Sequence, residues 1–227
     1  MRAIVLLSGG LDSSVLAYHL VKALGHEVDA VSVDYRQRHR CELRAAQCIA
    51  RELGIRHNVV DLSSLCGLIA TSALTGGMDV PHGHYEADSM RATVVPNRNM
   101  MMVSIAGAIA ASRGAKLVAV AVHAGDHAIY PDCRPVFIDR VDRALAVATE
   151  GHGDVRVVAP FVRMTKADIV RAGHELGVPF ALTWSCYEGG KRHCGFCGTC
   201  VERREAFALA NVPDPTEYEP IQVRRSG

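Results

Sequence analysis

The sequence predicts an α/β protein with a Rossmann-like parallel sheet, helices on both faces of the sheet and a small cysteine-rich C-terminal subdomain. Short apolar, β-branched runs alternate along the chain with segments of helical periodicity, which is typical of a parallel sheet. The first apolar run, residues 3–7, passes directly into a turn with two glycines, Gly9-Gly10. Four cysteines gather between residues 186 and 200, which predicts a separate small unit there.

Each element is expected from its own pattern and its own boundary residues. The apolar runs predict strands over 3–7, 28–33, 57–60, 116–121 and 155–158. Helical periodicity predicts helices over 12–24, 40–53, 98–112, 135–149, 165–176 and 201–210. Gly25, Gly54 and Gly114 follow the first three helices, where a glycine favours a C-terminal cap. The fifth helix begins with Thr165 and Asp168 in the arrangement of a capping box.

The chain of 227 residues, 49% of them hydrophobic, is long enough for one large domain with an appendage. We expect an α/β domain over 1–180, a cysteine-rich and helical appendage over 181–212 and an irregular tail over 213–227. Residues 62–97 show no strong period, and a long connection of this kind is usually functional. We interpret this segment as a substrate lid or a dimer contact, with a plain surface loop as the equal alternative.

Composition excludes several classes of protein. The net charge is +1, and no run of basic residues interleaved with aromatic residues occurs, so a dedicated nucleic-acid groove is not expected. No apolar stretch is long enough to span a bilayer, which excludes an integral membrane protein. The chain enters a core strand without a signal peptide, and we therefore expect a cytoplasmic enzyme.

The turn after the first strand predicts a phosphate site. Backbone N–H groups at the start of a helix are unpaired and carry partial positive charge, so they attract phosphate oxygens. Two glycines let the backbone approach an anion closely, and hydroxyl groups add donors. A carboxylate in the first turn can cap the helix or help to hold a metal ion. The residues of this site are Ser8, Gly9, Gly10, Leu11, Asp12, Ser13 and Ser14.

The cysteine cluster has the spacing of metal ligands. Two-residue gaps allow successive thiolates to surround one ion, and four thiolates around Zn²⁺ form a closed, structural site. An iron–sulfur site is the competing interpretation, and His193 could replace one of the cysteines. The expected ligands are Cys186, Cys194, Cys197 and Cys200.

Three further polar strings follow predicted strands, on the sheet edge where ligands of open α/β sheets collect. They cover residues 34–40, 93–99 and 126–135. Within them Arg98 offers a planar fork to a carboxylate or phosphate, and Asn99 offers an amide edge. Each string alone could be a solvated loop or a helix cap. Their common position on one edge favours a functional site.

Taken in order, the motifs indicate a family. The string S-G-G-L-D-S resembles the PP-loop of the ATP pyrophosphatases, which cleave ATP between the α and β phosphates. Together with D-Y-x-Q-R-H, V-P-N-R-N, Y-P-D-C-R and W-S-C-Y…C-G-x-C-x-x-C, it resembles the 7-cyano-7-deazaguanine synthase family over about residues 3–210. Arg36 stands where that pattern has glycine, and Val136 where it often has Glu.

The resemblance implies an ATP-dependent C–N ligase of queuosine and deazaguanine biosynthesis. It implies conversion of 7-carboxy-7-deazaguanine and free ammonia to the nitrile, with consumption of two ATP. It also implies Mg²⁺ bound with ATP, a structural Zn²⁺ ion and assembly as a homodimer. Val33 and Asp34 would flank the adenine, and Lys166 would reach the pyrophosphate or lie on the surface. The remaining predicted catalytic contacts to substrate or phosphate are Asp12, Arg98, Asp126, Asp132 and Arg134.

Two alternatives remain open from the sequence. One is a PP-loop tRNA-modifying enzyme of the thiolase type, which would need a catalytic cysteine or an iron–sulfur cluster and a basic RNA surface. The other is a non-catalytic zinc-containing module that only binds nucleotide. Cys133 is the cysteine nearest to the predicted site, but no neighbouring base is identifiable and the expected chemistry requires none.

Overall fold

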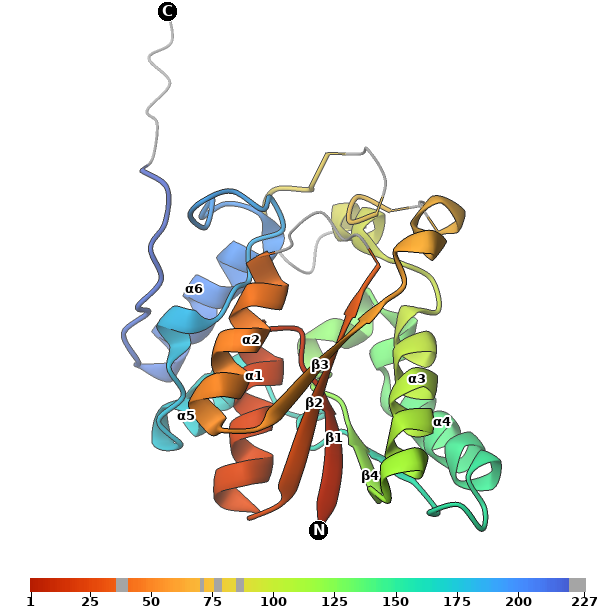
Figure 1. The fold of residues 1–227 in the computed structure, drawn as a ribbon. Coiled ribbons are helices and arrows are strands. Elements are labelled where there is room, and N and C mark those ends of the chain that lie inside the picture. The colour runs from red at the N-terminus through yellow and green to blue at the C-terminus, as the bar shows by residue number, and fades with distance from the viewer. Residues whose placement is uncertain (36–40, 70–71, 76–78, 85–87, 221–227) are drawn as a thin grey trace, which may run out of the picture.

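The structure is a computed structural model, and it describes residues 1–35, 41–69, 72–75, 79–84 and 88–220. Its centre is a parallel sheet in the order β3-β2-β1-β4-β5 (Figure 1). The strands are β1 (Arg2–Leu6), β2 (Glu27–Asp34), β3 (Arg56–Asp61), β4 (Leu117–Ala119) and β5 (Arg156–Val158). The strand order reverses between β1 and β4, and ligands of open α/β sheets bind at such a switch point.

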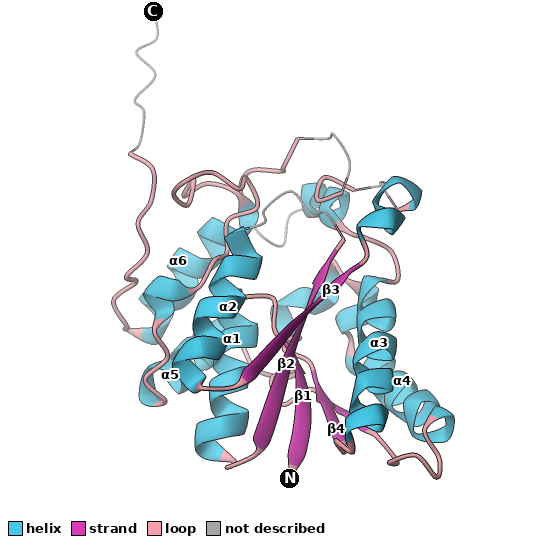
Figure 2. Cartoon of the chain, in the orientation of Figure 1, coloured by secondary structure: helices cyan, strands magenta, loops and turns pink. Residues whose placement is uncertain are grey.

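Helices cover both faces of the sheet, as the sequence predicts (Figure 2). They are α1 (Leu11–Tyr18), α2 (Cys41–Leu53), α3 (Arg98–Arg113), α4 (Pro135–Ala148), α5 (Lys166–Glu175) and α6 (Gly198–Ala210). A π-helical segment, His19–Ala23, continues α1, and short 3-10 helices cover Ser63–Leu68, Asp88–Thr93, Ala124–Ala128, Pro131–Cys133 and Phe180–Leu182. No helix in the described ranges is long and apolar enough to cross a membrane.

Two apolar cores lie on the two faces. The core on one side packs α1, α2, α5 and α6 against the sheet, with Val15, Ile49 and Phe207 among its buried residues. The core on the other side packs α3 and α4 and includes Val103 and Leu145. Because both faces are covered, the central strands β1 and β4 are apolar on both sides, which is why they read as continuous apolar runs in the sequence.

The expected boundaries agree with the structure apart from a few residues. The predicted strand over 116–121 is shorter, because the chain leaves the sheet after Ala119 and turns into the site. Helix α6 begins three residues earlier than predicted, at Gly198, because Cys197 of the cysteine cluster caps it. The capping box of α5 is present, since the Thr165 side chain accepts a hydrogen bond from Asp168 N and Asp168 accepts one from Thr165 N.

Parts of the connection over 62–97 pack inward, although other described residues, such as Leu68, are exposed. Ser72, Ala73 and Met90 are buried, and Thr93 Oγ1 forms a 2.6 Å hydrogen bond with Tyr130 Oη. Leu74 lines the cavity described below. These contacts rule out a plain surface loop for those residues, whereas the lid and the dimer contact stay predictions.

Residues 213–220 contain no helix or extended strand, as expected for the tail, but they are held in place. Tyr218 forms a bridge to His193, and its hydroxyl donates to Asp214 at 2.6 Å. The expected division of the chain into 1–180, 181–212 and 213–227 stays a prediction. Arg36 lies outside the described residues, and Val136 is exposed on α4.

Candidate active site

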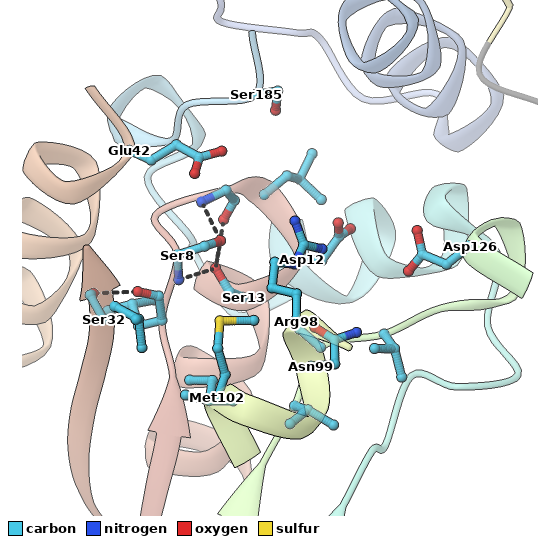
Figure 3. Close-up of a pocket in the computed structure, with 18 of the residues that line it drawn as sticks. Ser8, Asp12, Ser13, Ser32, Glu42, Arg98, Asn99, Met102, Asp126 and Ser185 are labelled. Atoms are coloured by element: carbon cyan, nitrogen blue, oxygen red, sulfur yellow. Dashed lines mark hydrogen bonds between the residues drawn. The ribbon is translucent and has the colours of Figure 1, made fainter. Parts of the chain in front are cut away.

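One cavity opens at the carboxyl ends of β1, β2 and β4 (Figure 3). Its walls come from the turn before α1, the end of β2, the start of α3, the segments after β4 and the chain leading into the cysteine cluster. Of the predicted site residues, those that line the cavity are Ser8, Gly10, Leu11, Asp12, Ser13, Val33, Arg98, Asp126 and Lys166.

The turn before α1, which the sequence predicts to bind phosphate, forms the floor of the cavity. Gly10 is the N-cap, and no side chain caps this end of the helix, so the first N–H groups of α1 face an open position. The hydroxyls of Ser8 and Ser13 lie 2.9 Å apart, and Ser8 Oγ accepts from Gly10 N at 3.2 Å. Ser14 does not line the cavity, because its hydroxyl donates to Gly10 O at 2.7 Å and stabilises the turn.

Gly9 is required by close packing and by backbone conformation. It has a φ of 87°, and a Cβ at this position would lie 2.2 Å from Glu42 O and 2.5 Å from Ala46 N. Only glycine fits between this turn and α2. Gly9 therefore shapes the phosphate turn without lining the cavity.

A charged cluster borders the turn. Lys166 Nζ lies 3.1 Å from Asp12 Oδ2 and 2.7 Å from Glu202 Oε2, and its side chain is 13% exposed. The first-turn surface position considered for Lys166 is therefore wrong. Burial opposes the charge on Lys166, but the two carboxylates outweigh burial and raise the pKa of its ammonium group. Burial also opposes the charge on Asp12, but the neighbouring Lys166 ammonium outweighs it, so the pKa of Asp12 is lowered.

His123 completes this cluster from the end of β4. Its Nδ1 accepts a hydrogen bond from Gly125 N at 3.1 Å, which assigns the proton of the neutral ring to Nε2. That Nε2 lies 3.5 Å from Asp126 Oδ1 and 3.7 Å from Glu202 Oε1. The cluster thus holds three carboxylates against one ammonium, and Asp12 Oδ1 is buried without a hydrogen-bond partner among the described residues. Such an excess of negative charge suits a cation.

Arg98 stands on another wall, at the first position of α3. Its Nε is buried and has no hydrogen-bond partner in the described part of the chain. Around its guanidinium lie the hydroxyls of Tyr35, Tyr187 and Tyr130 and the thiol of Cys133. Burial raises the pKa of Tyr35 and of Cys133, so both are neutral at pH 7. This partly buried guanidinium can therefore bind an anion in the cavity.

Besides Gly9 and Ser14, three predicted residues of the nucleotide and substrate site lie outside the lining of the cavity. Asp132 Oδ2 accepts from Asn99 N at 2.9 Å and so caps the start of α3. Arg134 is exposed, and its Nε donates to His127 O at 2.9 Å. Asp34 follows Val33 at the end of β2 but does not line the cavity. Their contacts with substrate or nucleotide stay predictions.

The sequence interpretation missed several residues of the site. His123 could have been identified from the sequence, because it directly follows the apolar run of β4 and precedes Asp126 by three residues. Glu202 gave no signal, because it lies beyond the cysteines on a helix that appeared to be part of the appendage. Glu42, Trp184 and Ser185 also line the cavity.

The four cysteines form one buried cluster. Their sulfur atoms all lie within 4.8 Å of one another. The backbone N–H groups of Cys194 and Cys197 donate to the sulfurs of Cys186 and Cys194 at 3.3 and 3.2 Å, as is usual around metal-bound thiolates. His193 is not part of the set, since its Nε2 accepts from Ser185 N at 3.0 Å.

Comparison with known proteins agrees with this geometry. A chain with this sheet order, an uncapped phosphate turn at the switch point and a four-cysteine cluster belongs to the class of PP-loop nucleotide enzymes. The family model described as "Queuosine biosynthesis protein QueC" matches residues 2–211. The chain belongs to this QueC family.

Curated relatives cover almost the whole chain. The chain is 56% identical to the 7-cyano-7-deazaguanine synthase of Rhizobium leguminosarum bv. trifolii, over 96% of this chain and 92% of that protein. It is 54% identical to the 7-cyano-7-deazaguanine synthase of Paracoccus denitrificans, over 99% and 96%. Among solved structures, NMN synthetase from Francisella tularensis has the same fold, with a TM-score of 0.51 at 17% identity over 93% of this chain and 77% of that one. Membership of the QueC family decides against the tRNA-thiolase alternative.

Proposed function

We propose that this chain is a 7-cyano-7-deazaguanine synthase, which converts 7-carboxy-7-deazaguanine, ammonia and two ATP to the nitrile. The observation that carries the proposal is membership of the QueC family over residues 2–211, in a chain whose cavity is lined by both the phosphate turn and Arg98. Relatives more than 50% identical carry this name. The conversion occurs in two adenylation rounds at one site.

In the first round a carboxylate oxygen of the substrate attacks the α-phosphorus of ATP, and the bond to the β-phosphate oxygen breaks. Pyrophosphate leaves, and ammonia then adds to the acyl carbon, displaces AMP and loses a proton to give the amide. In the second round the amide oxygen attacks a second ATP, and pyrophosphate leaves again. The adduct then loses AMP and both protons of the former amide nitrogen, which gives the nitrile.

The residues of the chain act mainly by holding charged groups in place, which supplies much of the rate in reactions of phosphate esters. The N–H groups of α1 and the hydroxyls of Ser8 and Ser13 hold phosphate oxygens. Lys166 binds the leaving pyrophosphate, and Arg98 binds the substrate carboxylate. Val33, at the end of β2, lies against the adenine.

The cofactors follow from the donor sets. Three carboxylates against one ammonium, with Asp12 Oδ1 unpartnered in the described structure, fit Mg²⁺ accompanying ATP, which would neutralise phosphate charge. Four buried sulfurs fit a structural zinc ion held by Cys186, Cys194, Cys197 and Cys200. A cytoplasmic location, a homodimer and the absence of a nucleic-acid partner belong to the same proposal.

The test is a product assay. The purified protein is incubated with ATP, Mg²⁺, ammonium and 7-carboxy-7-deazaguanine, and AMP, pyrophosphate and the nitrile are followed by mass spectrometry. We expect all three products, and none when the deazaguanine acid is omitted. A parallel reaction with glutamine in place of ammonium should give no nitrile. Failure to form AMP and nitrile in the complete mixture would contradict the proposal.

A further inference from the structure

We propose that Glu202 is a positioning residue of this site, which holds the Lys166 ammonium against the pull of Asp12 so that Lys166 can bind the pyrophosphate group. This inference rests on the proposed function. It also gives helix α6, which follows the cysteine cluster, a direct part in the chemistry.

Two carboxylates compete for the ammonium group of Lys166. Its Nζ lies between two carboxylates, 2.7 Å from Glu202 Oε2 and 3.1 Å from Asp12 Oδ2. Asp12 belongs to the phosphate turn. Its other oxygen, Oδ1, has no hydrogen-bond partner among the described residues, so it can bind a cation. When the cation of a nucleotide draws Asp12 toward the phosphates, Glu202 remains as the anchor of the ammonium.

The position of Glu202 is fixed by its burial and by its contact with His123. Its side chain is only 13% exposed, and Oε1 lies 3.7 Å from His123 Nε2. His123 is itself held, since its backbone N–H donates to Asp126 Oδ2 and its Nδ1 accepts from Gly125 N. Glu202 therefore contacts Lys166 from a fixed position, because its neighbour His123 is itself held in place.

Helix α6 carries Glu202 into this place. Cys197 is the N-cap of α6, and Cys200 lies in its first turn, two residues before Glu202. The adjacent Arg203 is fully buried and donates to Thr183 Oγ1 at 2.8 Å and to Phe180 O at 3.1 Å. The start of α6 is thus fixed by the cysteine cluster on one side and by Arg203 on the other.

The experiment measures the dissociation constant of pyrophosphate by calorimetry, with the metal-loaded protein and Mg²⁺. Glu202→Gln keeps the size and an acceptor oxygen but removes the charge, and we expect affinity for pyrophosphate to fall about 10-fold. Affinity for 7-carboxy-7-deazaguanine should stay unchanged. Glu205→Gln is the matched control, because Glu205 lies on the same helix but is exposed and paired with His84, and it should bind pyrophosphate like the unmodified protein.

A double-mutant cycle separates positioning from general stability. If Glu202 acts through Lys166, Glu202→Gln should add nothing to the loss already caused by Lys166→Met. Equal pyrophosphate affinity in Glu202→Gln and the unmodified protein, or additive losses in the double variant, would overturn the proposal. Thermal unfolding of each variant verifies that it is folded. Because binding is measured without turnover, this result is independent of whether the nitrile is formed.

Discussion

We expect the side chain of Arg98 to distinguish the two adenylation rounds. In the first round the group to be activated is an anion, whereas in the second it is a neutral amide. The neighbours of Arg98 are phenols and a thiol, and its Nε has no partner among the described residues. An anionic substrate therefore gains a charge pair with Arg98 that the amide cannot form.

We predict that Arg98→Met lowers kcat/KM for the carboxylic acid about 100-fold, and that for the amide, supplied directly, only a few-fold. Lys166→Met serves as the comparison, because a contact with pyrophosphate is needed in both rounds and should be lost equally in both. The measurement is steady-state nitrile formation from each of the two starting compounds. Equal losses on acid and amide in Arg98→Met would show that Arg98 binds the nucleotide instead.

Cys133 lies in the cavity wall but carries no chemistry in this account. Burial raises the pKa of its thiol, so the nucleophilic thiolate is absent near pH 7. Its sulfur accepts a hydrogen bond from Asn99 Nδ2 at 3.2 Å, a contact that a serine hydroxyl can replace. We predict that Cys133→Ser keeps nitrile formation within about threefold of the unmodified protein. A loss of two orders of magnitude in a folded variant would point to covalent catalysis.

At the scale of elements, the bidentate pair between Asp142 on α4 and Arg156 on β5 attaches a helix to the sheet edge. Asp142 accepts from Arg156 Nε at 2.9 Å and from Val157 N at 2.8 Å. The hydrogen bond from Arg156 is the main cause that lowers the pKa of Asp142, although burial opposes it. Because folding lowers this pKa, the stabilisation is present above the ordinary carboxyl pKa and is lost as the pH falls through the folded value.

We predict that Asp142→Asn lowers the free energy of unfolding at pH 7 by about 1–2 kcal/mol, a figure reduced for the solvent exposure of Arg156. The difference from the unmodified protein should shrink as the pH falls below the ordinary carboxyl pKa, and it should vanish below the lowered pKa of folded Asp142. Asp139→Asn is the control on the same helix, since Asp139 and Arg143 are both exposed. Urea unfolding across this pH range gives the values. A difference that is constant with pH would show that the ion pair does not contribute.

The elements also show what the sequence could predict. Every strand and long helix was predictable, because apolar periodicity and terminal glycines depend on neighbours in the chain. The cavity walls were predictable where they follow a strand, as with Ser8 after β1 and Asp126 after β4, since parallel strands bring their carboxyl ends together. Glu202 was not predictable, because its contact with Lys166 depends on how α6 packs against α5. The positions of Lys166 and Glu202 along the sequence do not indicate that packing.

At the scale of the whole molecule, the cysteine cluster packs between the cavity wall and residues of the C-terminal tail. Trp184 and Ser185, which line the cavity, lie beside it, and Tyr218 packs against it from the tail. We predict one zinc ion for each chain and no iron, measured by elemental analysis. Cys200→Ser should lose the metal and lower Tm by about 10 °C. An unchanged Tm in the metal-free variant, or iron in the purified protein, would contradict the structural-zinc assignment.

The central claim is that one site adenylates the same substrate twice, first as the carboxylate and then as the amide. The most direct measurement uses 7-carboxy-7-deazaguanine labelled with ¹⁸O in both carboxylate oxygens, followed by mass spectrometry of AMP and nitrile. Each adenylation transfers one carboxylate oxygen to the phosphate of AMP. We predict two AMP for every nitrile, each AMP carrying one ¹⁸O. Unlabelled AMP, or one AMP for each nitrile, would contradict the account.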